Sequence, residues 1–323
     1  MELPIIDDSQ VTSRTPWPLL IDAISDAFRR GGESPVRNHH AIPGNDREDI
    51  TLLQMPAWDR DGEFGIKLAT IAPSNAALGY PTLHGVYVLF SGATGIPEAI
   101  LDAGALTARR TAAASALASR CLSRRDARTL LIIGTGRVAR QLIGAHCSVR
   151  PIEEVRIWGR NAAHAEDVAD EASQAIGVRC VVATDVETGA AGADIISSAV
   201  PSESPLLRAD WVAPGTHIDL VGAYKPTMCE ADVDVVGTAD HVFVDTIEGA
   251  ESEAGDLIQA VQAGTFSFDA IAGDMYRMSL GAASLRNSPE EITLFKSVGA
   301  ALEDLAAAQL CVRQLKAQQN WQS

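Results

Sequence analysis

Residues 130–146 predict a strand, a glycine turn and a helix, and this segment constrains the fold more than any other. It reads LLIIGTGRVARQLIGAH, in which Gly134, Gly136 and Ala139 form a G-x-G-x-x-A pattern. In that pattern the first glycine turns the chain, the second leaves room for phosphates, and the small third residue lets helix and strand pack closely. The N-terminus of the helix then faces the negatively charged pyrophosphate of the dinucleotide. A merely structural tight turn is the alternative, but the flanking strand and helix favour a dinucleotide-binding unit.

A parallel sheet is predicted around this unit. Short apolar runs occur at residues 130–133, 155–158, 181–183, 194–199, 217–221 and 242–244, with helical or turn segments between them. Buried strands that alternate with helices indicate a sheet covered on both faces. We therefore expect an α/β protein with a Rossmann-type, doubly wound parallel sheet.

The first third of the chain has a different pattern. A helix is predicted over residues 18–30, and alternating runs that begin at Asp49, Gly65 and His84 predict antiparallel strands. The alanine-rich segment that begins at Gly104 predicts a helix leading out of this α+β region. Near the C-terminus, Ser288 and Pro289 resemble the start of a helix that would continue to about residue 318.

Composition excludes some classes of protein. The 323 residues are 46% hydrophobic, and the formal net charge of −16 argues against a nucleic-acid partner, which needs a basic surface. The N-terminal segment lacks the pattern of a signal peptide, and no apolar stretch has the length of a membrane span. Five scattered cysteines suit reduced thiols, and no Cys/His cluster predicts a metal site. We expect a cytoplasmic protein that contacts no membrane.

The end of the second predicted strand bears on which cofactor binds. An NAD enzyme presents Asp or Glu there to the ribose 2′-hydroxyl, whereas this chain has Gly159, Arg160 and Asn161. An arginine pairs with a 2′-phosphate, so NADP(H) is favoured over NAD(H), unless Arg160 only caps a solvent-facing loop. Residues after the fourth and fifth strands lie at the ligand-binding edge of such a sheet. The predicted cofactor-binding residues are Gly134, Thr135, Gly136, Arg137, Val138, Gly159, Arg160, Asn161, Ser198, Ala199, Val200 and Gly222.

Three further motifs carry a family resemblance. They are YPTLHGVYVLF from Tyr80, LTARRTAAASALA from Leu106 and ITLFKSVGAALEDLAAA from Ile292. With the glycine fingerprint, they make the chain resemble the ornithine cyclodeaminase and mu-crystallin family over nearly its whole length. The resemblance implies a homodimer with a substrate-binding and dimerisation domain, residues 1–116 with 292–323, and a Rossmann domain, residues 117–291. It also implies redox chemistry on amino acids and cyclic imines.

The resemblance also implies a substrate site. Arg37, Lys67 and Arg110 match the basic residues that hold the substrate carboxylate in this family, and guanidinium groups suit that task because they bind bidentately. Lys67 and Arg110 are the predicted catalytic residues. Lys67 lies in an apolar strand, where burial near other cations would lower its pKa and make it a candidate proton donor or acceptor at the imine nitrogen. Thr82 and His84 are expected to line the pocket near the nicotinamide, although His84 equally suits a structural role.

Tyr224 marks a departure from the cyclodeaminases. Those enzymes present an Asp at the matching position, and the Lys that follows it is matched here by Met228. A phenol with a pKa of about 10 does not replace a carboxylate that must be charged. The resemblance then favours an NADPH-dependent ketimine reductase that converts Δ1-pyrroline-2-carboxylate to proline and Δ1-piperideine-2-carboxylate to pipecolate. The alternatives are an ornithine cyclodeaminase, an amino acid dehydrogenase of the same fold, or a catalytically silent NADP-binding protein of mu-crystallin type.

Overall fold

The chain forms two compact units. The computed structural model describes residues 3–44, 47–60, 62–281 and 285–320. Unit 1 is Met1–Arg110 with Ala300–Ser323, and unit 2 is Thr111–Gly299. These divisions lie a few residues from the boundaries after residue 116 and before residue 292 that the sequence predicts. None of the helices in the described ranges combines the length and apolar character that a membrane crossing requires.

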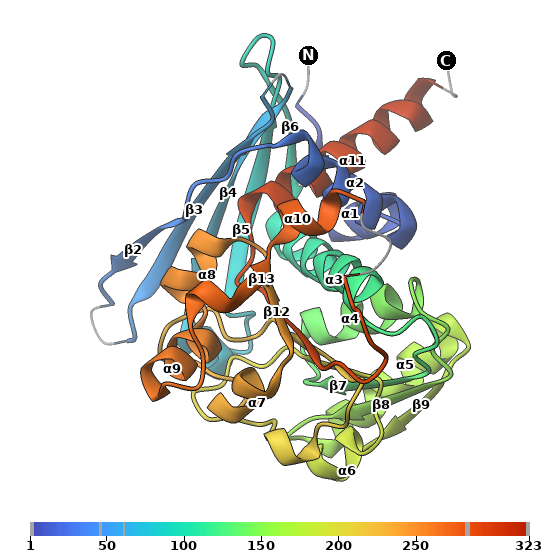
Figure 1. Ribbon diagram of the computed structural model, residues 1–323. Helices are drawn as coiled ribbons and strands as arrows, with labels where there is room; N and C mark the ends of the chain where they lie inside the picture. The colour runs from blue at the N-terminus through green and yellow to red at the C-terminus, as the bar shows by residue number, and fades with distance from the viewer. Residues whose placement is uncertain (1–2, 45–46, 61, 282–284, 321–323) are drawn as a thin grey trace. The chain divides into compact units, whose positions relative to one another are not determined.

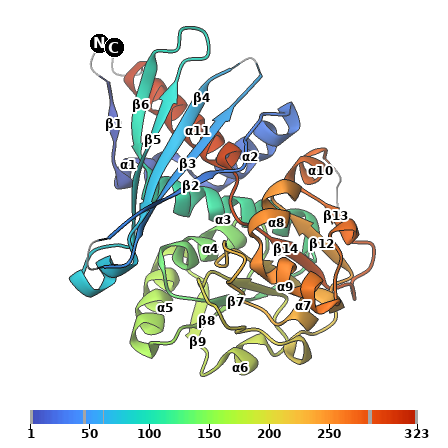
Figure 2. The same cartoon turned by 90° about the vertical axis from the view of Figure 1, so that its left-hand side faces the viewer.

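Unit 1 contains a six-stranded sheet. In spatial order its strands are β1 (Ile5–Ile6), β6 (Pro97–Asp102), β5 (Leu83–Phe90), β4 (Phe64–Ile71), β3 (Ile50–Trp58) and β2 (Asn38–Ile42). Neighbouring strands from β6 to β2 are antiparallel, which confirms the prediction from the alternating runs, and β1 joins β6 in parallel. The helical segments are α1 (Asp8–Arg14), α2 (Trp17–Arg30), η1 (Pro73–Leu78), the start of α3 (Ala103–Leu122), and α11 (Ala301–Asn320). Helix α11 packs on β3, β4, β5 and α2, behind the sheet in Figure 2.

The inward face of this sheet holds one charged residue that matters for the site. On β4 the buried positions are Gly65, Lys67 and Ala69, because alternate residues of a strand point to the same face. Lys67 is paired in register with Met55 of β3 and Tyr87 of β5, both of which are buried. The strand pattern therefore places the Lys67 ammonium among core side chains rather than in solvent.

Unit 2 contains an eight-stranded parallel sheet. In spatial order its strands are β13 (Ile271–Gly273), β12 (His241–Val244), β14 (Thr293–Lys296), β11 (His217–Leu220), β10 (Ile195–Ser198), β7 (Thr129–Ile133), β8 (Glu154–Trp158) and β9 (Arg179–Val182). Its helices are the rest of α3, α4 (Arg137–Cys147), α5 (Ala162–Ile176), α6 (Val186–Ala190), α7 (Val233–Thr238), α8 (Ile247–Glu253), α9 (Gly255–Ala263) and α10 (Met275–Ser279), with the short turns η2 (Ala209–Trp211) and η3 (Phe268–Ala270). All neighbouring strands are parallel.

Helices cover both faces of the parallel sheet, as a doubly wound fold requires (Figure 1). On one face, side chains such as Leu131 and Ile196 form a core with residues of α6, α7, α8 and α9. On the other face, Asp219 of β11 accepts hydrogen bonds from Ser115 of α3, at 2.9 Å, and from the ring of His146 of α4, at 3.4 Å. From β7 the strand order runs to β8 and β9 on one side and to β10 and β11 on the other. The Rossmann-type fold predicted from the sequence is confirmed, and its ligand-binding crevice is expected at the carboxyl ends of β7 and β10.

The helix predicted to begin at Ser288 is wrong. Glu290 N donates to Ser288 Oγ at 3.2 Å, as at a helix start, but the chain then forms strand β14 and helix α11 begins only at Ala301. Strand β14 is fully buried between β11 and β12. Gly299, with φ at +91°, separates the strand from the helix. Burial in the centre of the sheet therefore prevails over the local capping signal.

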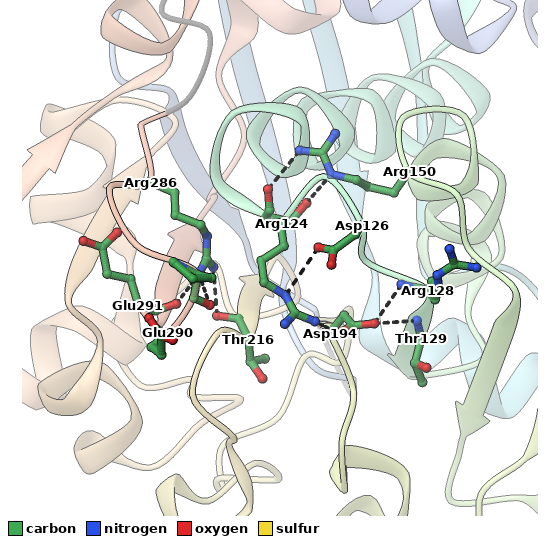
Figure 3. A network of polar contacts seen from close by, with 12 residues as sticks. Arg124, Asp126, Arg128, Thr129, Arg150, Asp194, Thr216, Arg286, Glu290 and Glu291 are labelled. Carbon is green, nitrogen blue, oxygen red and sulfur yellow. Dashed lines mark hydrogen bonds and ion pairs between the residues drawn. The ribbon is translucent and has the colours of Figure 1, made fainter.

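Arginine side chains make polar contacts at the amino-terminal edge of the parallel sheet (Figure 3). The Asp194 carboxylate precedes β10, accepts from the backbone N–H groups of Arg128 and Thr129 at 2.7 and 2.9 Å, and pairs with Arg124. Arg286 donates to the carbonyl of Leu122 at 2.8 Å, and Arg150 donates to other carbonyls in the last turn of α3. These contacts add charged donors to carbonyls at the end of α3, and they lie away from the carboxyl ends of the strands.

Candidate functional site

The nucleotide turn, residues 134–138, connects β7 to α4 in unit 2. Gly134 has φ at +121°, a conformation that residues with a side chain rarely adopt, and its N–H donates to Trp158 O at 2.8 Å. Gly136 is the N-cap of α4, and a Cβ added there would meet no atom within 4 Å. A Cβ on Gly134 would lie 3.5 Å from the Ala139 methyl, so the small third residue permits close packing. Open space at a helix N-terminus fits a pyrophosphate.

The other predicted residues of this turn are accessible to a ligand to different degrees. Arg137 is exposed in the first turn of α4, while Thr135 and Val138 are partly buried. The Thr135 methyl group lies 2.5 Å from where a Cβ on Gly159 would be, so the turn reaches the end of β8. The structure therefore brings the predicted phosphate and ribose positions together within unit 2.

The end of β8 presents one basic side chain and one capping side chain. Arg160 is exposed, and no acidic residue occurs at residues 159–161. The Asn161 side chain accepts from the N–H groups of Ala163 and His164, at 3.0 and 3.4 Å, and so caps α5. Asn161 thus has a structural role that the sequence analysis did not expect, beside the cofactor contact predicted for it.

The ends of β10 and β11 lie beside the nucleotide turn. A Cβ on Gly134 would approach Ala199 O and Val200 Cγ2, each to 3.2 Å, and a Cβ on Gly222 would approach Val200 N to 2.2 Å. Ser198 is fully buried and its hydroxyl donates to Glu230 Oε1 at 2.6 Å. The predicted residues Ala199, Val200 and Gly222 are therefore adjacent, whereas the Ser198 side chain is directed toward the interior.

Tyr224 follows these strand ends, at the position where cyclodeaminases present a carboxylate. Its side chain is partly buried against the hydrophobic core of unit 2. The Lys225 ammonium lies 5.9 Å from the centre of the Tyr224 ring, within reach of a cation–π interaction. The position is thus occupied by an aromatic ring beside a cation.

Unit 1 holds a buried cluster of charged groups. Lys67 Nζ donates to Asp304 Oδ2 at 2.7 Å and to Thr107 Oγ1 at 3.3 Å. Arg110 donates from Nε to Asp304 Oδ1 at 3.1 Å and from Nη1 to Glu303 Oε2 at 2.6 Å. All four charged side chains are buried, and α11 contributes both carboxylates. We call Lys67, Arg110, Glu303 and Asp304 the charge cluster.

The protonation of Lys67 is finely balanced in this cluster. Burial lowers the pKa of the Lys67 ammonium from 10.5 to about 8, the Asp304 carboxylate raises it, and the Arg110 and Arg37 cations lower it. Arg37 is partly buried and near enough to act on Lys67, so the three predicted basic residues gather in unit 1. The pKa of Lys67 is thus lowered, as expected from the sequence.

Arg109, next to Arg110 on α3, faces a different environment. Its guanidinium lies 3.3 Å from the centre of the Trp17 ring and donates from Nε to Thr15 Oγ1 at 3.2 Å. Adjacent residues on a helix point in different directions. Arg109 therefore contacts Trp17 and Thr15, whereas Arg110 belongs to the charge cluster.

Thr82 and His84 lie away from the charge cluster. Both side chains are exposed, and alternation along β5 puts His84 on the face opposite to Tyr87, hence opposite to Lys67 of the paired strand. The structure therefore does not bring these two residues to the cluster within unit 1.

Two groups of buried residues were missed by sequence reasoning. They are Glu303 and Asp304, and the group Glu230, Asp256 and Lys296 in unit 2. The signal was present in KSVGAALED, which carries a lysine and two acids inside an otherwise apolar C-terminal motif. Charged residues in an apolar run are rarely buried unless they are paired. Within the described ranges, no group of three His, Cys, Asp or Glu side chains is arranged to hold a metal ion.

Comparisons with known proteins agree with this geometry. The Δ1-pyrroline-2-carboxylate reductase of Colwellia psychrerythraea is 35% identical over 316 residues, which cover 97% of this chain and 99% of the relative. The solved structure of Thermococcus litoralis Δ1-pyrroline-2-carboxylate reductase with NADH and L-proline has a TM-score of 0.92 at 27% identity, covering 98% of each chain. An archaeal alanine dehydrogenase dimer with bound NAD has a TM-score of 0.89 at 28% identity, covering 99% of this chain and 98% of that one.

The sequence profile of the ornithine cyclodeaminase/mu-crystallin family matches residues 4–319. That match spans both units, including the nucleotide turn and the charge cluster. It confirms the resemblance inferred from the glycine fingerprint and the three further motifs. The chain belongs to the ornithine cyclodeaminase/mu-crystallin family.

Proposed function

We propose that this protein is a nicotinamide-dependent oxidoreductase that acts on C=N bonds and reduces Δ1-pyrroline-2-carboxylate to proline. The proposal rests above all on the buried charge cluster with its proton-exchanging lysine, Lys67. Reductases of this substrate among the relatives support it. We extend the proposal to the six-membered ring, Δ1-piperideine-2-carboxylate, which carries the same imine and carboxylate.

The charge cluster and its surroundings suit a substrate that carries a carboxylate. Arg37 acts on Lys67, so three basic side chains, Arg37, Lys67 and Arg110, gather in this part of unit 1. Basic groups, and guanidinium groups above all, favour the binding of a substrate carboxylate. Pairing with that carboxylate would orient the ring, and a fixed orientation is a large part of catalysis in such reactions.

Lys67 is the proposed proton donor. Reduction of an imine adds a hydride to the carbon and a proton to the nitrogen, so the protein must supply a proton at a defined position. An ammonium with a pKa of about 8 is mostly protonated at neutral pH yet releases its proton readily. Asp304 holds the Lys67 ammonium in place by their 2.7 Å hydrogen bond.

Unit 2 is the proposed cofactor domain. The nicotinamide cofactor, when bound, supplies the hydride. The open space at Gly136 would receive the pyrophosphate, the end of β8 the adenosine ribose, and the ends of β10 and β11 the nicotinamide half, because these strands lie on the other side of the switch point. We propose NADP(H) over NAD(H), since exposed Arg160 is the basic group at the ribose position.

Turnover of defined substrates tests this function. When purified protein is mixed with NADPH and Δ1-pyrroline-2-carboxylate, the nicotinamide absorbance at about 340 nm should fall and proline should form. Release of proline and ammonia from ornithine, with no net change in cofactor, would instead identify a cyclodeaminase. The aromatic Tyr224 at the carboxylate position disfavours that outcome. Tight NADPH binding with no turnover of any imine would identify a silent binding protein.

We also propose a homodimer that pairs the outward face of the unit 1 sheet. Trp58, Phe64 and Phe90 align in register across β3, β4 and β5, and the two Phe rings stack at 5.0 Å. Trp58, Phe64 and Val86 on this face are each more than a third exposed. Contiguous exposed apolar surface of this kind is typical of an interface. The archaeal dehydrogenase of the same fold is a dimer.

The cysteines support a reducing location. All five, Cys121, Cys147, Cys180, Cys229 and Cys311, lie among the described residues and are free thiols. Proteins of oxidising compartments commonly pair their cysteines. We therefore propose a cytoplasmic protein.

A further inference from the structure

Glu230 is a fully buried carboxylate beside the ends of two neighbouring strands of unit 2. Its Oε1 accepts from Ser198 Oγ at 2.6 Å and from Val200 N at 2.9 Å, at the end of β10. Its Oε2 accepts from Gly222 N at 2.6 Å and from Ala223 N at 3.0 Å, after the end of β11. Each carboxylate oxygen therefore holds one strand end.

The two strand ends leave no free space between them. A Cβ on Gly222 would lie 2.2 Å from Val200 N and 2.6 Å from Glu230 Oε1, so only glycine permits this approach. On its other side, Val200 lies against the nucleotide turn, with Cγ2 at 3.2 Å from where a Cβ on Gly134 would be. A shift of Val200 would therefore disturb both the nucleotide turn and the end of β11.

Glu230 is fixed from behind by two further buried charges. Asp256 of α9 accepts from the N–H groups of Glu230 and Ala231, at 2.6 and 3.1 Å. Lys296 of β14 lies 2.8 Å from Asp256 Oδ2 and 3.5 Å from Glu230 Oε2. Two carboxylates and one ammonium leave a negative charge in the core, which is costly unless hydrogen-bond donors compensate it. The donors from the strand ends provide that compensation.

We propose that Glu230 is a positioning residue for cofactor binding: its carboxylate sets the geometry of residues 198–200 and 222–223. The proposal rests on the function proposed above, in which these strand ends receive the nicotinamide half. Only the ionised carboxylate accepts all four hydrogen bonds. An amide has no acceptor on its nitrogen side and leaves Val200 N–H or Gly222 N–H without one, and a protonated acid offers only the weaker acceptor of a hydroxyl oxygen on one side.

The ionisation of Glu230 should make this geometry depend on pH. Burial raises the pKa of Glu230 to about 7, the Lys296 ammonium lowers it and the Asp256 carboxylate raises it. These charged groups act on it from β14 and α9, whereas β10 and β11 present the neutral Ser198 hydroxyl and backbone N–H groups. Protonation below neutral pH would weaken the hydrogen bonds to one strand end, so we expect cofactor affinity to fall as the pH falls through 7.

The test compares Glu230→Gln with the wild-type protein. The Kd of NADPH is measured from nicotinamide fluorescence between about pH 6 and pH 8.5, together with imine turnover and the unfolding midpoint. At the alkaline end we expect the Gln variant to bind NADPH about tenfold more weakly, as loss of one hydrogen bond to a charged group predicts. Its Kd should not change with pH, whereas the wild-type Kd should rise toward it in acid.

Asp219→Asn is the matched control. Asp219 is equally buried in the same sheet, but it accepts from the side chains of Ser115, Ser197 and His146 and from none of the strand-end N–H groups given above. We expect this variant to lose stability and to keep its NADPH affinity. If Glu230→Gln does not fold, Glu230→Asp takes its place. The Asp variant keeps the charge but is too short to reach both strand ends.

The results separate the two proposals. An unchanged Kd and unchanged pH dependence in Glu230→Gln would overturn the positioning role, as would an equal loss of affinity in Asp219→Asn. Wild-type protein that binds no nicotinamide cofactor would contradict the proposed function itself.

Discussion

At the scale of single residues, Lys67 occupies an inward strand position that normally holds an apolar side chain. Its ammonium is buried beside Met55 and Tyr87 and is stabilised by the Asp304 carboxylate. Burial of an unpaired ammonium would be strongly unfavourable, so the ion pair is what allows a lysine at this position. Burial, which the Asp304 carboxylate offsets only in part, lowers the pKa of Lys67 to about 8.

The first prediction concerns this pKa. If Lys67 donates the proton, kcat/KM for the imine at saturating NADPH should be constant in acid and should fall about tenfold per pH unit above about pH 8, because the ammonium is lost there. Lys67→Met should lower turnover by about 100-fold or more while NADPH affinity is unchanged. Lys67→Arg keeps the charge without a transferable proton, so recovery of turnover in that variant would contradict the role as proton donor.

A second prediction concerns Asp304. Its carboxylate raises the pKa of Lys67, so Asp304→Asn should move the alkaline fall of the pH–rate profile to lower pH. Glu303→Gln is the control, since Glu303 pairs with Arg110 and the hydrogen bond from Lys67 goes to Asp304. Equal displacement of the profile by both variants would mean that the cluster responds to total charge rather than to the Lys67–Asp304 pair.

Arg160 provides a third prediction. Arg160→Asp should weaken NADPH binding by roughly 10- to 100-fold, since a 2′-phosphate would lose a charge-assisted contact and meet a like charge. NADH affinity should stay the same or increase. Equilibrium titration with both cofactors measures the ratio of the NADPH and NADH dissociation constants. If Arg160→Asp leaves this ratio unaltered, Arg160 only faces solvent.

Sequence could identify residues whose role follows from local pattern. Gly134 was predicted from the turn, whereas Lys67 and Arg110 were predicted from the family resemblance, with the apolar strand around Lys67 predicting its lowered pKa. Asp304 and Glu230 could not be predicted in this way, because their roles depend on partners that are distant in sequence. Asp304 meets a lysine 237 positions away. Asn161 was predicted as a cofactor residue, whereas its cap on α5 requires the helix to start at the next residue.

At the scale of elements, the last turn of α3 depends on Arg150. The guanidinium donates to Ser119 O at 2.8 Å and to Ser123 O at 3.0 Å. Arg150→Met should lower the free energy of unfolding by about 2 kcal/mol, since these carbonyls lose a charged donor. Denaturant unfolding of both proteins measures this difference in the free energy of unfolding. Arg208→Met, which removes an exposed pair with Asp210, should change stability little, and an equal loss would contradict the capping role.

Strand β14 illustrates the limit of local sequence patterns. Its four residues come shortly after Ser288 and Pro289, which resemble the start of a helix but form only a turn. Longer runs with clear alternation, such as β4 and β5, were predicted with nearly correct bounds. The difference is physical: β14 becomes a strand because β11 and β12 pair with it from both sides. No short window of sequence contains those partners.

At the scale of the whole molecule, the apolar face of the unit 1 sheet predicts self-association. Phe64→Glu would place a charge where Trp58 and Phe90 line up beside it, so this variant should be monomeric while the wild-type protein is a dimer. Light scattering after size-exclusion chromatography measures the mass. Leu280→Glu, at an apolar residue of unit 2 that is 75% exposed, is the control and should leave the mass unchanged.

The return of α11 to unit 1 has a consequence for synthesis on the ribosome. Unit 2 is one continuous segment and can fold while the chain is still emerging, since domains generally fold as units from the N-terminal side. Unit 1 cannot be completed then, because Glu303 and Asp304 leave the ribosome after the whole of unit 2 and long after Lys67 and Arg110. Until they arrive, two cations have no carboxylates to meet in the core. The nascent chain can therefore acquire its nucleotide fold before its charge cluster.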